Sequence, residues 1–103
     1  MAKEHIIFDK TEIIFAVLNE GQPHLENIKY SDIIFVKFKM GEKKGLFGKA
    51  GEVIEVKTKR KSVTMDQAKE KKFWDGYKAG MRKFCTDNRI TLYDEVGGEN
   101  IHA

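Results

Sequence analysis

The chain has 103 residues, and its 41% hydrophobic and 11% aromatic content is sufficient for one domain with its own core. The aromatic content argues against intrinsic disorder, and the single cysteine, Cys85, excludes an internal disulfide and a cysteine-rich metal site. No apolar run approaches the roughly 20 residues of a membrane-spanning helix, and residues 1–5 do not resemble the start of a signal peptide. We therefore expect a single cytoplasmic domain over residues 1–103.

Positive charge is concentrated in one segment. The net charge is +3, but residues 37–61 hold nine basic and three acidic residues, a local charge of +6. The rest of the chain therefore carries −3. This pattern indicates a mildly acidic protein with one basic segment.

Residues 4–65 have the pattern of β-strands. Short apolar and β-branched runs occupy residues 6–8, 11–18, 31–40, 52–59 and 62–65. Turn-forming residues separate them at 19–23 and 59–61, a spacing typical of consecutive antiparallel strands. Strict alternation in the third run predicts that Ile34, Val36 and Phe38 share one face and that Ile33 and Phe35 share the other with Lys37 and Lys39.

The period changes to that of a helix at residue 66. Apolar residues recur at three- and four-residue intervals from Phe73 to Cys85, which predicts an amphipathic helix over residues 66–88. Thr64 or Asp66 is the expected N-cap. Gly76 and Gly80 weaken such a helix, and we expect close packing on the sheet to compensate. Residues 90–93 are expected to form one more short strand, followed by a flexible tail at 96–103.

The expected fold is α+β, a bent antiparallel sheet or partly open barrel of five to seven strands covered by the carboxyl-terminal helix. The residues expected in its core combine the strand and helix faces. They are Ile14, Ala16, Ile34, Val36, Phe38, Val53 or Ile54, Val63, Trp74, Tyr77, Met81 and Phe84.

No group of residues points to catalysis or to a metal. His5, His24 and His102 lie in different segments without companions at metal-ligand spacing. Cys85 lies on the apolar helix stripe, where a buried thiol is the better interpretation than a nucleophile. We expect no catalytic residue, no metal and no cofactor.

The glycine-rich loop at residues 41–51 is the one segment that resembles a phosphate-binding loop. Gly48 and Lys49 are followed by Ala50 where a magnesium-binding hydroxyl is required, which argues against a nucleotide site. A nucleotide- or phosphate-handling domain that uses this loop remains the alternative function. Leu46 and Phe47 among lysines are instead typical of a contact with a membrane surface or a partner protein.

The basic segment supplies the candidate binding residues. The simplest interpretation of its lysines is a solvated face of a sheet, and the more specific interpretation is an anion-binding surface. Nucleic acid is not favoured, because Arg60 is the only arginine in the segment. The candidate residues for contact with a partner protein or an anionic membrane surface are Lys37, Lys39, Lys43, Lys44, Leu46, Phe47, Lys49, Lys57, Lys59, Arg60 and Lys61.

Residues 28–33, with the sequence IKYSDI, are similar to the I-x-Y-x-D-I step of bacterial pleckstrin-homology-like (PH-like) and GRAM-type domains. Trp74 falls where that family often places a core tryptophan, and the order of strands followed by one helix also resembles it. The resemblance implies a PH-like fold and a non-catalytic binding module, with ligands that range from phosphoinositides to peptides. The resemblance does not indicate which of these ligands this chain binds. Five or six predicted strands, where the family usually has seven, leave the sheet incomplete.

Apolar residues on both faces of the 11–18 strand suggest an assembly. Ile13, Phe15 and Val17 lie on one face, and Ile14 lies on the other with Ala16 and Leu18. One covering helix shields only one of these faces, and an exposed apolar face favours association. We therefore predict a homodimer through this surface or a neighbouring edge strand. A monomer whose sheet curls over both faces is the alternative.

Overall fold

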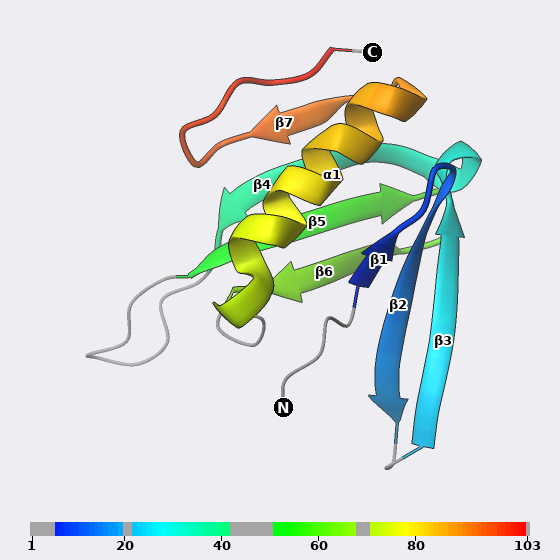
Figure 1. Cartoon of the computed structure of the whole chain (residues 1–103). Helices are drawn as coiled ribbons and strands as arrows, with labels where there is room; N and C mark the ends of the chain where they lie inside the picture. The colour runs from blue at the N-terminus through cyan, green and yellow to red at the C-terminus, as the bar shows by residue number, and fades with distance from the viewer. Residues whose placement is uncertain (1–5, 20–21, 42–50, 68–70, 103) are drawn as a thin grey trace.

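The fold was taken from a computed structural model of the chain, in which residues 6–19, 22–41, 51–67 and 71–102 are described. These residues form seven strands in two sheets, together with one α-helix, α1 (Trp74–Asn88), and two 3₁₀ turns, η1 (Tyr30–Asp32) and η2 (Lys71–Phe73) (Figure 1). The expected α+β class is therefore confirmed. The described strands do not close into a barrel.

The first sheet has the strand order β1-β2-β3, and all its pairs are antiparallel. Its strands are β1 (Ile6–Phe8), β2 (Glu12–Asn19) and β3 (Gln22–Lys29). The strand β3 was not predicted, because Pro23 and several polar residues weaken its pattern. Its position at the edge of the sheet accommodates proline, since an edge strand leaves half of its N–H groups outside the ladder.

The second sheet has the order β6-β5-β4-β7. Its strands are β4 (Ile33–Met40), β5 (Glu52–Thr58), β6 (Ser62–Asp66) and β7 (Leu92–Asp94). The strand β7 pairs in parallel with β4, so the expectation of an entirely antiparallel sheet was wrong.

A register shift between Ile33 and Phe35 corrects the predicted faces of β4. The extra residue, Ile34, points outward with 53% of its surface exposed, whereas Ile33 is buried. The strict alternation assumed from the sequence failed here because a β-bulge places two residues of one strand opposite one residue of its partner.

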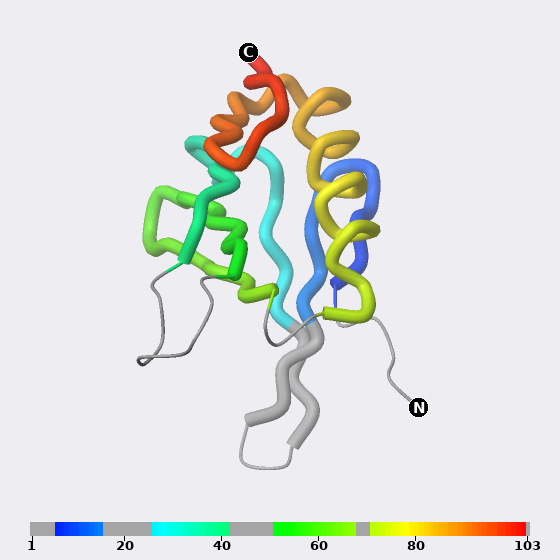
Figure 2. The backbone as a smooth tube through the Cα atoms, turned by 90° about the vertical axis from the view of Figure 1, so that its left-hand side faces the viewer, coloured from blue at the N-terminus to red at the C-terminus, as the bar shows by residue number. Residues whose placement is uncertain are grey.

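The core is enclosed by three elements: α1, the inner face of the second sheet, and the first sheet, which lies to one side of the other two (Figures 1 and 2). Of the expected core residues, the buried ones are Val36, Phe38, Ile54, Trp74, Tyr77, Met81 and Phe84. Ile14 and Val63 are half-buried, and the side chain of Ala16 lies outside the described residues. Ile13 and Phe15 are buried instead, so the inner face of β2 is the opposite of the one expected.

The predicted helix starts too early. Asp66 belongs to β6, and Gln67 continues the pairing with β5: its N–H donates to Glu52 O at 2.9 Å and its Oε1 accepts from Glu52 N–H at 3.0 Å. Thr64 and Asp66 are therefore strand residues, not N-caps. The carboxyl-terminal end of the helix was predicted correctly, and Arg89 closes it in the left-handed conformation with φ 55°.

The carboxyl-terminal segment, expected to be a flexible tail, is attached to the rest of the protein through residue 101. Ile101 and Leu92 exchange backbone hydrogen bonds of 2.8 and 2.9 Å. The Arg82 side chain of α1 donates to Glu99 O at 2.9 Å. These contacts follow from the position of β7 at a sheet edge, where unpaired backbone groups are available to a further segment.

Candidate binding site

The structure divides the candidate basic residues between two surfaces. Lys37, Lys39 and Lys57 lie on the outer face of the second sheet, away from α1. Lys59, Arg60 and Lys61 form the turn between β5 and β6. The other candidates, Lys43, Lys44, Leu46, Phe47 and Lys49, lie outside the described residues.

On the outer face, the lysines alternate with a carboxylate. Glu55 lies directly opposite Lys37 in the register and accepts a hydrogen bond from Lys39 Nζ at 3.2 Å. The hydrogen bond from Lys39, together with the charges of both lysines, holds the pKa of Glu55 below its usual value despite partial burial. This face is therefore a mixed-charge surface and not a continuous patch of lysine amines.

An aromatic pair adjoins these lysines. Phe35 of β4 and Tyr93 of β7 meet edge to face, with ring centroids 5.6 Å apart. Lys37 Nζ lies 5.7 Å from the Phe35 ring centroid, within the range of a cation–π interaction. Tyr93 is 41% exposed, so its ring is accessible from solvent.

The β5–β6 turn is ordered by one buried hydroxyl. Thr58 is only 7% exposed, and its Oγ1 accepts hydrogen bonds from the N–H groups of Arg60 and Lys61 at 3.3 and 3.0 Å and donates to Lys61 O at 2.6 Å. The Lys59 N–H donates to Asp32 O of η1 at 3.0 Å, which ties the turn to the start of β4. The backbone that carries Arg60 and Lys61 is therefore held from both sides.

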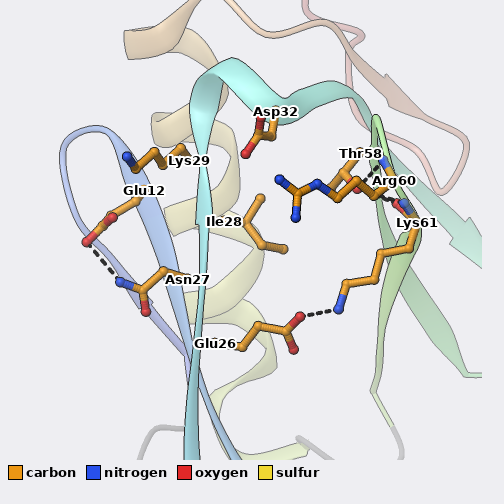
Figure 3. A pocket seen from close by; sticks show the side chains of 9 residues that line it. All are labelled: Glu12, Glu26, Asn27, Ile28, Lys29, Asp32, Thr58, Arg60 and Lys61. Carbon is orange, nitrogen blue, oxygen red and sulfur yellow. Dashed lines mark hydrogen bonds and ion pairs between the residues drawn. The ribbon is translucent and has the colours of Figure 1, made fainter.

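This turn borders a cleft of about 540 Å³ between the two sheets (Figure 3). Residues from β2, β3, η1 and the turn line it: Glu12, Glu26, Asn27, Ile28, Lys29, Asp32, Thr58, Arg60 and Lys61. An ion pair between Lys61 Nζ and Glu26 Oε1 spans the cleft. The Arg60 side chain points from the turn into the cleft, toward Ile28 (Figure 3).

The sequence analysis identified the basic side of this cleft and missed the other side. Glu26 and Ile28 belong to β3, the strand that was not predicted, and Asp32 was noted only as part of the family-like step. No local pattern places them opposite the turn at 59–61, because the contact depends on how the two sheets meet.

Neither a metal site nor an activated nucleophile occurs among the described residues. No group of three or more His, Cys, Asp or Glu side chains in that part of the chain lies close enough to hold a metal ion. Burial raises the pKa of the Cys85 thiol to about 12, so the thiol is protonated at neutral pH. Most of the glycine-rich loop lies outside the described residues, apart from its base, where Gly41 N–H donates to Gly51 O at 2.7 Å.

None of the helices in the described ranges is long and apolar enough to cross a membrane. Comparison with protein families, curated proteins and solved structures found no significant match to this chain. The functional argument therefore depends on the geometry of this chain alone.

Proposed function

We propose that this protein is a non-catalytic binding module of PH-like type that recognises an acidic segment of a partner protein through residues 37–61. The observation that carries this proposal is the distribution of unpaired positive charge. Lys37, Lys57, Lys59 and Arg60 make no ion pair with any described residue. Lys78, Arg82 and Lys83 of α1 are each paired with a carboxylate. The other unpaired basic residues of the described ranges are spread over several elements: Lys10, Lys29, Lys71, Lys72 and Arg89.

The PH-like part of the proposal has support from the architecture. Six strands in two sheets precede α1, which matches the family's order of strands followed by one helix and is one strand short of its usual seven. One departure is that β7 follows the helix and pairs in parallel with β4. The fold does not select the ligand, so the choice of an acidic protein depends on the surface.

A polypeptide suits this surface better than a lipid bilayer does. Glu55 and Asp66 lie on the same outer face as the lysines, so this face is not uniformly positive, as a surface that lies flat on anionic headgroups is expected to be. Ser62 and Thr64 add neutral hydrogen-bonding groups, and Phe35 with Tyr93 adds an aromatic contact. A mixture of lysines, hydroxyls and aromatic rings is complementary to an acidic peptide that also carries apolar side chains.

The test is binding of a fluorescein-labelled, glutamate-rich peptide, measured by anisotropy over a salt series. A matched peptide with glutamine in place of glutamate controls for charge. We expect the glutamate peptide alone to bind, with affinity that falls as salt rises. The double variant Lys37→Glu, Lys57→Glu should weaken binding by about tenfold.

The control variant Lys71→Glu, Lys72→Glu makes the same change in net charge at exposed positions of η2. It should weaken binding much less. Equal losses in the two variants, or sedimentation with anionic vesicles in the absence of peptide binding, would contradict the proposal.

A further inference from the structure

Two of the three basic side chains that line the cleft between the sheets are unpaired. Lys61 is paired with Glu26, whereas Lys29 and Arg60 make no ion pair or side-chain hydrogen bond with the described residues. Arg60 lines the cleft together with Ile28 and Asp32, and its side chain extends from the turn toward Ile28 (Figure 3). A guanidinium presents two parallel N–H donors, which match the two oxygens of a carboxylate.

The surroundings of Arg60 are already ordered for binding. The hydroxyl of Thr58 holds the backbone N–H of Arg60, and the adjacent Lys59 N–H is bonded to Asp32 O at 3.0 Å. Because the backbone is fixed before binding, the protein loses less conformational entropy when the ligand binds. The ion pair with Glu26 neutralises Lys61 and leaves Arg60 to meet the ligand.

The charges that line the cleft favour a ligand group with a single negative charge. Three carboxylates (Glu12, Glu26 and Asp32) balance three basic groups (Lys29, Arg60 and Lys61). These carboxylates repel a phosphate dianion about twice as strongly as a single carboxylate, and one carboxylate is sufficient to take both donors of the Arg60 fork. Ile28 belongs to the core and leaves only a small apolar surface at the wall of the cleft.

We propose that this cleft binds one glutamate or aspartate carboxylate of the acidic partner, with Arg60 as its bidentate hydrogen-bond donor. The inference rests on the proposed function and adds the specific site to it. Thr58 is a positioning residue, because it acts on the ligand through the turn. The lysines on the outer face of the second sheet then attract the acidic partner, and Arg60 determines where the partner binds.

The experiment is an NMR titration of the ¹⁵N-labelled full chain with a peptide that carries a single glutamate, and with its glutamine analogue. We expect the amide shifts to concentrate at residues 28 and 58–61 for the glutamate peptide only. Arg60→Lys retains the charge and loses the fork, and it should weaken binding about tenfold. Lys59→Ala removes a charge from the same turn outside the cleft, and it should weaken binding less than about twofold.

Thr58→Val preserves the shape and charge of the turn and removes the hydroxyl that orders it. This variant should bind the glutamate peptide severalfold more weakly, while its NMR spectrum remains that of a folded chain. If Thr58→Val unfolds the chain, the comparison of Arg60→Lys with Lys59→Ala still decides the matter, because both positions are exposed.

Several results would overturn the inference. Unchanged affinity of Arg60→Lys, with weaker binding by Lys59→Ala, would mean that only net charge matters. Tighter binding of a phosphoserine peptide would mean that the cleft prefers phosphate. Shifts confined to residues 37 and 57 would exclude the cleft but leave the proposed function standing. Absence of binding by any acidic peptide would contradict both this inference and the proposed function.

Discussion

Asp94 joins three parts of the chain through one carboxylate. Its side chain is 3% exposed, pairs with Arg82 of α1, and accepts the N–H of Val96 at 2.9 Å. Burial by itself raises the pKa of Asp94, but the hydrogen bonds from Val96, Arg82 and Gly98 outweigh it and leave the pKa below its usual value. The ionised form is therefore the one that stabilises the fold.

We predict that Asp94→Asn lowers the free energy of unfolding at pH 7 by about 2 kcal/mol. A lowered pKa in the folded state means that this stability is complete above the pKa of an unfolded aspartate, about 3.9. It is lost as pH falls through the folded-state pKa. Urea denaturation of both proteins should thus show a difference that narrows below about pH 4.

Asp87→Asn provides the matched control. Asp87 pairs with Lys83 at 2.9 Å on the exposed face of the same helix, with 54% of its side chain exposed. An exposed pair of this type contributes less than about 0.5 kcal/mol. A difference between wild type and Asp94→Asn that did not change with pH would show that the charge of Asp94 is not what stabilises the fold.

At the scale of elements, the two glycines of α1 have different roles. A Cβ on Gly80 would lie 2.6 Å from Cδ2 and 2.7 Å from Cε2 of the Phe8 ring, so the absence of a side chain lets the helix approach β1. That ring also packs near Phe84, with centroids 6.5 Å apart. Gly76 has no atom within 4 Å of the corresponding position. The compensation by close packing expected from the sequence therefore holds for Gly80 and not for Gly76.

Alanine substitutions at these two positions should have opposite effects on stability. Gly76→Ala should stabilise the protein by about 0.5–1 kcal/mol, because it improves helix propensity without a clash. Gly80→Ala should destabilise it by about 1–3 kcal/mol, because the Phe8 ring must move from its packed position. Chemical denaturation measures both, and stabilisation by Gly80→Ala would show that α1 does not lie as close to β1 as described.

At the scale of the whole molecule, the apolar surface available for a homodimer differs from the one expected. Phe15 is buried, so the inner face of β2 is part of the core. The outer face shows Ile7, which is 56% exposed, opposite the half-buried Ile14 in the β1–β2 register. We propose that the chain forms a homodimer through this outer face of the first sheet.

Light scattering at micromolar concentration tests this assembly. We expect twice the chain mass of 11.9 kDa for the natural protein. Ile7→Lys should give the mass of one chain, because a buried lysine opposes association. Lys10→Glu, at an exposed position of the turn after β1, serves as the control and should leave the mass unchanged. A natural protein of 11.9 kDa would exclude the dimer.

The sequence alone determined the features that depend on local periodicity. The apolar spacing from Trp74 to Cys85 predicted the buried helix face, and β-branched runs located β1, β2, β4, β5 and β6. The charge count located the basic segment and with it Arg60 and Lys61. These features depend on residues close in the chain, so the pattern was sufficient.

Only the tertiary structure decided the features that depend on distant segments. Placement at a sheet edge allows Gln22–Lys29 to form a strand despite Pro23. The bulge at Ile34 buries Ile33 and exposes Ile34, the opposite of the prediction for these two residues. Pairing of Gln67 with Glu52 extends β6 in place of the first helical turn. The cleft arises because the edge of one sheet meets the turn of the other, so Glu26 and Ile28 come to face Arg60 from more than thirty residues away. Contacts of this kind depend on sheet packing, which no local pattern encodes.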